Sequence, residues 1–192
     1  MHPPPNSSGS PVHHGARGFT AIELMVTIGI AAILAALAAP SFTGLMERWR
    51  VRQAAEGLQS TLYYARSEAM KRGGNVVMQK LPNGTNGCSA LTTQEWSCGW
   101  VVCADTNGNG ACGNSEPVLQ RVDAPINLDV MRTGNGASVA FNRWGMPGSW
   151  LGFSIQPHDQ PASDAIRGVC MSSGGRVRVI PSEDVPCSPT NN

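Results

Sequence analysis

The sequence has very few of the residues from which catalytic and metal sites are usually built. Three of its four histidines lie within the first 17 residues, and His158 is the only one after them. No two cysteines have the C-x-x-C spacing of a zinc site, and no glycine-rich loop leads from a strand into a helix to hold a phosphate. A Ser-His or Cys-His pair would depend on His158 alone. These absences argue against an enzyme and against a metal or another cofactor.

The sequence also lacks an excess of charge of either sign. Its first 17 residues, MHPPPNSSGSPVHHGAR, are rich in Pro, Ser, Gly and His and are typical of a targeting leader. Without Arg17 of this leader, 13 basic residues stand against 13 acidic ones. Overall charge therefore cannot attract a polyanion, and any binding of nucleic acid requires a local basic patch.

Charge is almost absent from residues 19–39. Glu23 is the only charged residue among these 21. As a helix the segment would be about 31 Å long, close to the thickness of the hydrocarbon core of a bilayer. We therefore predict one transmembrane helix over 19–39. A carboxylate within such a helix costs free energy, so Glu23 is expected to have a partner.

The pattern after Pro40 stays helical as far as residue 72. Apolar residues recur at spacings of three and four, which predicts an amphipathic spine helix over 40–72. Pro40 is expected to kink the helix without ending it, and Gly73-Gly74 is expected to end it. The apolar positions are Phe42, Leu45, Met46, Trp49, Leu58, Leu62, Ala65 and Ala69.

Residues 75–192 have the pattern of a β-structure. Eight short apolar runs are separated by clusters of Gly, Asn, Pro and Asp, which predicts an antiparallel sandwich or meander with the helix packed on one face. The predicted class is α+β, with a leader (1–18), a transmembrane helix (19–39), a spine helix (40–72) and a β head (75–192). The runs are VVMQ, WVVCA, PVLQRV, INLDVM, SVAFN, GFSIQ, GVCMS and RVRVI.

All six cysteines lie in the predicted head. An even number of cysteines on the exported side of a membrane anchor predicts disulfides in an oxidising compartment. Among the possible connectivities, proximity in the sequence favours Cys88–Cys98, Cys103–Cys112 and Cys170–Cys187.

Three interpretations of the N-terminus compete. An uncleaved signal anchor leaves Glu23 unexplained. A secretory signal cut at the A-x-A site of residues 36–38 would discard a helix that continues in phase. The third starts from the order Arg17, Gly18, Phe19 and then Glu23, followed by apolar residues. This order closely resembles the class III signal of type IV pilins and of the pseudopilins of type II secretion.

This resemblance implies how the N-terminus is processed and used. A membrane-embedded prepilin peptidase would cut after Gly18 and leave the apolar run in place, and the new amine of Phe19 would be N-methylated. Glu23 would then pair with the N-terminal ammonium of a neighbouring subunit during assembly, which matches a buried carboxylate to a cation. The protein would cross the inner membrane once, with a periplasmic head, until it enters a filament at the cell surface.

Two further segments resemble the FimT/GspH group of minor pilins and pseudopilins. They are LQSTLYYARSEAMKRGGNVVM (58–78) and GWVVCADTNGNGACGNSEPVLQRV (99–122). The resemblance implies a type IV pilin-like fold and other pilins or pseudopilins as partners. It leaves two functions open. FimT-type proteins are minor pilins of type IV pili, and some bind DNA during natural transformation. GspH-type proteins are structural subunits near the tip of the secretion pseudopilus.

The segment SGGRVRVI, residues 173–180, favours the FimT-like function. It resembles the C-terminal GRxR motif of competence-linked FimT proteins through Gly175, Arg176 and Arg178. On a strand the two arginines would share a face about 7 Å apart, close to the spacing of adjacent phosphates on one DNA strand. Guanidinium groups suit phosphate oxygens. Val177 and Val179 would point into the head.

Neighbouring charges bear on this interpretation. Arg167 and Arg143 are candidates for a third phosphate contact, whereas Asp164, Glu183 and Asp184 flank the segment and would weaken the patch. Two or three contacts imply weak, salt-sensitive binding without sequence preference. The alternative is the solvated face of an ordinary edge strand.

Two other patterns in the head are interpreted as structural. Residues 105–116, DTNGNGACGNSE, fit a calcium-loop pattern with Asp105, Asn107, Asn109 and Glu116 as ligands. Because both flanks predict strands, a hairpin loop rich in Asn and Gly is favoured over a calcium site. Four tryptophans are expected to fill the core or plug loops rather than to form a stacking platform, namely Trp96, Trp100, Trp144 and Trp150.

Overall fold

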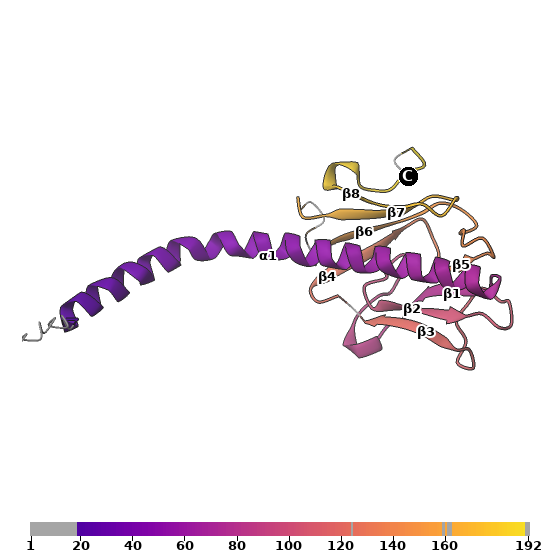
Figure 1. Ribbon diagram of the computed structural model, residues 1–192, viewed down its shortest axis with the longest axis horizontal. Coiled ribbons are helices and arrows are strands. Elements are labelled where there is room, and N and C mark those ends of the chain that lie inside the picture. The colour runs from indigo at the N-terminus through magenta and orange to yellow at the C-terminus, as the bar shows by residue number, and fades with distance from the viewer. Residues whose placement is uncertain (1–18, 124, 159, 161–162, 191–192) are drawn as a thin grey trace, which may run out of the picture. The chain divides into compact units, whose positions relative to one another are not determined.

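The computed structural model describes residues 19–123, 125–158, 160 and 163–190, and of residues 38–42 it describes the backbone. The predicted leader, with Gly18, lies outside the described residues. The chain forms two compact units, Met1–Ser41 and Phe42–Asn192. Helix α1 (Ala21–Arg72) contributes to both units and continues through Pro40, while all eight strands belong to the second (Figure 1).

In the first unit, α1 begins with a capping box. The backbone N–H of Thr20 donates to Glu23 Oε2 at 2.9 Å, and the N–H of Glu23 donates to Thr20 Oγ1 at 3.3 Å. Each residue therefore satisfies a free N–H group of the other at the helix start. The order T-x-x-E over residues 20–23 is the sequence signature of a capping box. The interpretation of Glu23 as an assembly residue does not include this local role of its carboxylate.

The side chains of residues 19–37 are all exposed within this unit, including the large apolar ones. Among the residues that the structure describes, no helix combines the length and the apolar character needed to cross a membrane.

In the second unit, one face of α1 is buried from Val51 onwards. The buried residues recur at spacings of four and three, as an amphipathic helix requires. Leu45, Met46 and Trp49, which were expected on the same face, are 48–62% exposed because they precede the part of the helix that the sheets cover. The helix ends as predicted, with the N–H of Gly74 donating to the carbonyl of Ala69 at 2.7 Å. The buried apolar positions are Val51, Ala55, Leu58, Leu62, Ala65 and Ala69.

The eight predicted strands form two four-stranded sheets, and every pairing is antiparallel. The strand order is β3-β2-β1-β5 in the first sheet and β4-β6-β7-β8 in the second. The predicted α+β class, with a long helix and antiparallel sheets, is therefore confirmed. The strands are β1 (Val76–Lys80), β2 (Gly99–Ala104), β3 (Val118–Asp123), β4 (Leu128–Thr133), β5 (Ser138–Phe141), β6 (Leu151–Pro157), β7 (Arg167–Met171) and β8 (Val177–Ile180).

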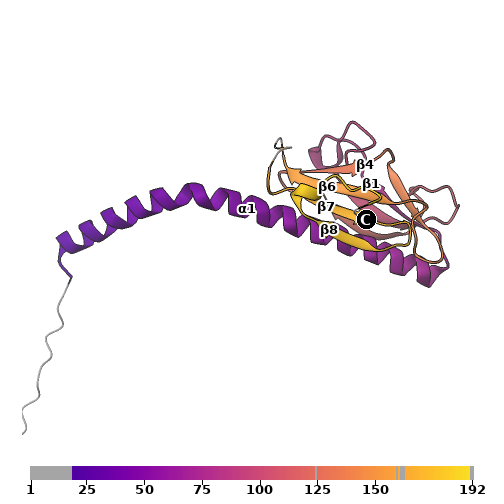
Figure 2. The same cartoon turned by 90° about the horizontal axis from the view of Figure 1, so that it is seen from above.

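One hydrophobic core joins α1 to both sheets, and Figure 2 shows the C-terminal half of the helix running along the strands. Trp96 packs edge-on against Phe153 with ring centroids 5.1 Å apart, and Trp100 donates its indole N–H to Thr61 Oγ1 at 3.3 Å. Full burial of side chains of this size contributes about 1.5–3 kcal/mol each. The expectation of core tryptophans is thus confirmed for Trp96 and Trp100. It is wrong for Trp144, which is 65% exposed.

Three disulfides link neighbouring cysteines in the head, and they are the pairs that proximity in the sequence favoured. Cys88 is bonded to Cys98, Cys103 to Cys112 and Cys170 to Cys187. The last of these ties the C-terminal segment to the second sheet, because Cys170 lies in β7.

Candidate nucleic-acid interface

The GRxR segment forms the second arm of a tight hairpin. The turn between β7 and β8 is closed by the N–H of Gly175, which donates to the carbonyl of Ser172 at 2.9 Å, and by the N–H of Ser172, which donates to the carbonyl of Arg176 at 2.9 Å. Ser172 Oγ accepts the N–H of Arg176 at 3.1 Å. Strand β8 lies at the edge of its sheet, and in the described part of the chain no strand pairs with it on the side away from β7.

The two arginines of the motif are exposed and lie on the outer face of this sheet. Arg178 lies opposite Cys170, and Val177 lies opposite Met171 and is buried in the core. Arg176 precedes Val177, so alternation places it on the side of Arg178. Within the described residues, neither guanidinium has a hydrogen-bond or ion-pair partner.

Val179 shares the inward face with Val177 but is 37% exposed. The expectation that both valines are buried in the head is therefore correct for Val177 alone. The reason is the position of β8 at the sheet edge, because among the described residues no strand lies beside Val179 on the side away from β7.

Arg167 lies away from the two arginines of the motif. It begins β7, opposite Ile155, and alternation places it on the inner face with Val169. Its Nη1 donates to the carbonyl of Ile166 at 2.7 Å. The structure thus brings Arg176 and Arg178 together and leaves Arg167 at the far end of the hairpin.

The flanking acidic residues also lie at that far end. Asp164 precedes β7, and Glu183 and Asp184 belong to the short 3-10 helix η2 (Ser182–Asp184), which follows β8. Asp164 and Glu183 line one shallow cavity there. Because the turn with Arg176 is at the opposite end of the strands, the fold separates the positive charges from the negative ones.

Helix α1 supports the GRxR turn through two side chains. Arg66 Nη1 donates to the carbonyl of Gly175 at 2.7 Å, and Tyr63 Oη donates to the carbonyl of Val177 at 3.3 Å. The apolar periodicity of residues 40–72 leaves Arg66 outside the predicted apolar face, so it does not predict this contact. Arg66 also packs against Gly145, where a Cβ atom would lie only 2.4 Å from Arg66 Cγ.

Gly175 is required by the shape of this turn. Its φ is +83°, and a Cβ atom there would lie 3.1 Å from Arg66 Cζ and 3.2 Å from the carbonyl oxygen of Gly145. We expect Gly175→Ala to lower the free energy of unfolding by about 1–2 kcal/mol, the usual cost of a left-handed conformation with a side chain. Gly174→Ala is the matched control, since a Cβ there meets only Ser172 Oγ at 3.8 Å. Urea unfolding of both variants tests this, and equal losses would contradict it.

Further basic residues surround the turn. Lys71 and Arg72 end α1, and the backbone N of Arg143 lies 3.2 Å from the position of a Cβ on Gly74, which follows that end. Glu68 offsets part of this charge by pairing with Arg72 at 2.8 Å and with Lys71 at 3.4 Å. The hydrogen bond from Arg72 is the main cause that lowers the pKa of Glu68, so its carboxylate stays charged at neutral pH.

The loop with the calcium-like pattern uses its carboxylates internally. Asp105 accepts the N–H groups of Gly108, Asn109 and Gly110 at 2.7–3.0 Å. Glu116 accepts those of Thr106, Asn107 and Gly113 at 2.7–3.3 Å. Both side chains are buried, and the loop closes onto them as a hairpin connection.

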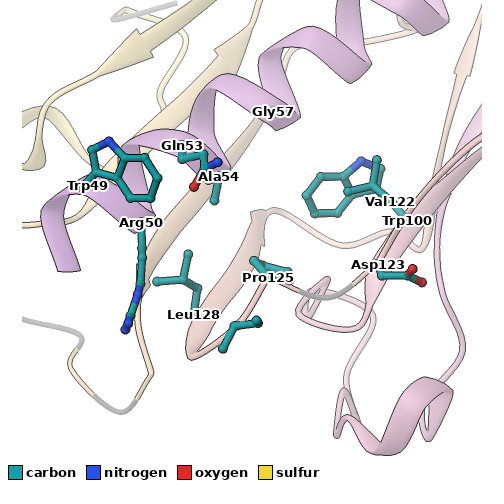
Figure 3. Close-up of a pocket in the computed structure, with 11 residues that line it drawn as sticks. Trp49, Arg50, Gln53, Ala54, Gly57, Trp100, Val122, Asp123, Pro125 and Leu128 are labelled. Atoms are coloured by element: carbon teal, nitrogen blue, oxygen red, sulfur yellow. The ribbon is translucent and has the colours of Figure 1, made fainter. Parts of the chain in front are cut away.

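A separate apolar cavity of about 450 Å³ lies between the middle of α1 and the connection from β3 to β4 (Figure 3). Trp49 and Trp100 face it from two sides. It is lined by helix residues 49–57, whereas the GRxR turn contacts the helix at Tyr63 and Arg66, so the two features are distinct. The lining comprises Trp49, Arg50, Gln53, Ala54, Gly57, Trp100, Val122, Asp123, Pro125, Ile126 and Leu128.

Comparison with known families gives one match over most of the head. Residues 54–175 match the family described as type II transport protein GspH. The chain belongs to the GspH family. Its members are minor pilins of type IV pili or pseudopilins of type II secretion, subunits that assemble with other pilins or pseudopilins into a filament.

The GspH-family fold is also that of two solved structures of the type IV minor pilin FimU from Pseudomonas aeruginosa strain PAO1. One is 24% identical, with a TM-score of 0.54, and the match covers 72% of this chain and 99% of FimU. The other is 23% identical, with a TM-score of 0.57, and covers 76% and 98%. These likenesses show the fold. The comparison with curated proteins found no match.

The match to the GspH family ends at Gly175, directly before the two arginines. Membership of the family therefore rests on the spine and on the strands up to β7. Arg176 and Arg178 lie outside the matched residues, so their function has to be inferred from their positions in this structure.

Proposed function

We propose that this GspH-family protein is a FimT-like minor pilin that binds DNA without sequence preference through Arg176 and Arg178, for DNA uptake in natural transformation. The observation that carries the proposal is the outer face of β8. Two exposed guanidinium groups without partners in the described chain lie there beside a hydrogen-bonded turn, and Asp164, Glu183 and Asp184 are at the other end of the strands. Guanidinium groups spaced along an extended strand suit successive phosphates.

The expected binding is weak for a single head. Two contacts release few counterions, so affinity falls with salt but starts from a low value. Several subunits in one filament would raise the effective affinity through multivalency.

The N-terminus is proposed to be processed as in other class III signals. A prepilin peptidase cuts after Gly18, Phe19 becomes the N-methylated N-terminus, and the apolar segment 19–39 holds the subunit in the inner membrane with its head in the periplasm. Glu23 then pairs with the N-terminus of a neighbouring subunit. The capping box supports this assignment, because it holds the carboxylate at the backbone of Thr20, next to Phe19.

The second candidate function is that of a GspH-like pseudopilin, a structural tip subunit in protein secretion that binds no DNA. The cavity beside Trp49, together with exposed Leu45 and Met46, favours contacts with other proteins. The two candidates share the same fold and the same anchor, so binding of DNA is the property that separates them.

Binding of the whole chain to DNA tests the proposal. The protein, made in an oxidising compartment and purified in non-ionic detergent, is titrated into a labelled duplex of about 20 base pairs at salt concentrations from about 50 to 200 mM. We expect binding that weakens with salt, with a slope of log K against log salt of roughly −2, since about 0.9 ion is released per phosphate contact. If the chain binds neither this duplex nor one of its separated strands at the lowest salt, the DNA role is overturned and the secretion pseudopilin remains.

A further inference from the structure

Trp144 is an exposed residue on a hydrogen-bonded turn, and it is not among the proposed DNA-binding residues. Its side chain is 65% exposed. The turn is fixed by Asn142, whose Oδ1 accepts the N–H groups of Trp144 at 2.9 Å and Met146 at 3.1 Å. The N–H of Gly145 also donates to the carbonyl of Asn142 at 2.8 Å. The indole ring is therefore exposed on a turn whose backbone is hydrogen-bonded to Asn142.

This turn lies directly against the GRxR turn. The carbonyl oxygen of Gly145 is 3.2 Å from the position of a Cβ on Gly175, and the side chain of Arg66 packs against both glycines. Trp144 and Arg176 are the sequence neighbours of these two glycines, so they flank the same junction. Figure 1 shows the connection after β5, the β7–β8 turn and the C-terminal end of α1 gathered at one end of the head.

The junction combines an exposed aromatic ring with several cations. Arg143 precedes Trp144 and is exposed, and Lys71 lies in the last turn of the nearby helix with 73% of its side chain exposed. Sites that bind single-stranded DNA combine such groups, because cations follow the phosphates while an aromatic ring stacks on a base. A base inside a duplex is already stacked on both faces, so the ring has nothing to stack on there.

We infer that Trp144 stacks on an unpaired base of a DNA strand whose phosphates contact Arg176 and Arg178, so that the site prefers single-stranded to double-stranded DNA. This inference rests on the proposed function and names the form of DNA that the same site takes. An exposed tryptophan can also serve as a contact for another protein subunit, and that alternative is an outcome of the test below.

The test compares one DNA strand of about 20 nucleotides, alone and annealed to its complement, for binding to the whole chain in detergent. For Trp144→Ala we expect affinity for the single strand to fall about tenfold and affinity for the duplex to change less than about twofold, since stacking contributes only where a base is unpaired. Trp144→Phe keeps a ring and should retain most of the single-strand affinity. Trp49→Ala removes an exposed tryptophan from a distant part of the head and is the matched control.

Fluorescence provides a direct readout of stacking. Single-stranded DNA is expected to quench the tryptophan emission of the wild-type protein and of Trp49→Phe. It should quench the emission of Trp144→Phe much less, because that variant has no indole at position 144 on which a base can stack.

The possible results distinguish the proposed binding of DNA from the inferred stacking of Trp144 on an unpaired base. If the protein binds DNA and Trp144→Ala leaves binding of the single strand unchanged, this inference is overturned while the proposed function stands, and Trp144 is then a contact for protein. If the wild-type chain binds neither form at low salt, the proposed function and this inference are both overturned. Equal loss for the single strand and the duplex would also overturn the preference.

Discussion

Replacing Arg176 and Arg178 together by glutamine is expected to weaken binding of DNA by about 25-fold at low salt. Each exposed charge-assisted contact is taken as about 1 kcal/mol, and each 1.4 kcal/mol corresponds to about a tenfold change in affinity. The slope of log K against log salt should become shallower by about two, since each lost phosphate contact removes about one released ion. Fluorescence anisotropy at several salt concentrations measures both quantities.

Arg167→Gln is the matched control for this double variant. It removes the same type of charge from the same hairpin, but from the inner face and the far end. We expect its affinity to change by less than about threefold, because the remaining effect is a weak and screened field. If Arg167→Gln weakens binding as much per charge as the double variant, the affinity for DNA depends on the overall charge of the head. The outer face of β8 then has no special role. Thermal unfolding by circular dichroism verifies that each variant is folded.

Asp105→Ala is expected to lower the free energy of unfolding by about 3 kcal/mol, the largest stability effect that we predict. The carboxylate is buried and accepts three N–H groups of its own loop. A hydrogen bond to a charged group contributes about 1.5–3 kcal/mol, and the sum is reduced because water reaches part of the opened loop. Urea unfolding under oxidising conditions, which keep Cys103–Cys112 intact, measures the change.

Two comparisons sharpen this prediction. Asn107→Ala removes one N–H acceptor from an exposed position of the same loop, and we expect a loss below about 1 kcal/mol. Calcium added to the wild-type protein is expected to leave the melting temperature unchanged, since the carboxylate oxygens of Asp105 and Glu116 already accept backbone N–H groups. A rise in melting temperature with calcium would show instead that the loop binds the ion.

The proposed DNA-binding surface and the apolar cavity lie in different parts of the head. The cavity and the exposed side chains near Trp49 lie along the first turns of α1 within the head, while the arginines and Trp144 lie near its C-terminal end. A subunit can therefore contact its neighbours through one region and leave the other open to DNA.

The sequence by itself determined the elements of this protein. The helix end at Gly73-Gly74, the eight strands and the pairing of neighbouring cysteines follow from apolar periodicity and from local turn chemistry. The hairpin that carries Arg176 and Arg178 is equally local, because its two strands are separated by one short turn. Such features depend on residues a few positions apart, so a single sequence contains the information for them.

Only the tertiary structure decided which of these residues meet. Arg66 contacts the carbonyl of Gly175 across 109 positions, and Gly145 lies against both of them. The exposure of Trp144 and the separation of Arg167 from Arg176 depend on strand order and on the face to which each residue alternates. The spacing of apolar residues predicts on which side of a helix or strand a residue lies, but it does not predict which residues pack against that side. Contacts between distant segments arise when two sheets and a helix close around one core, and they therefore become visible only in the folded chain.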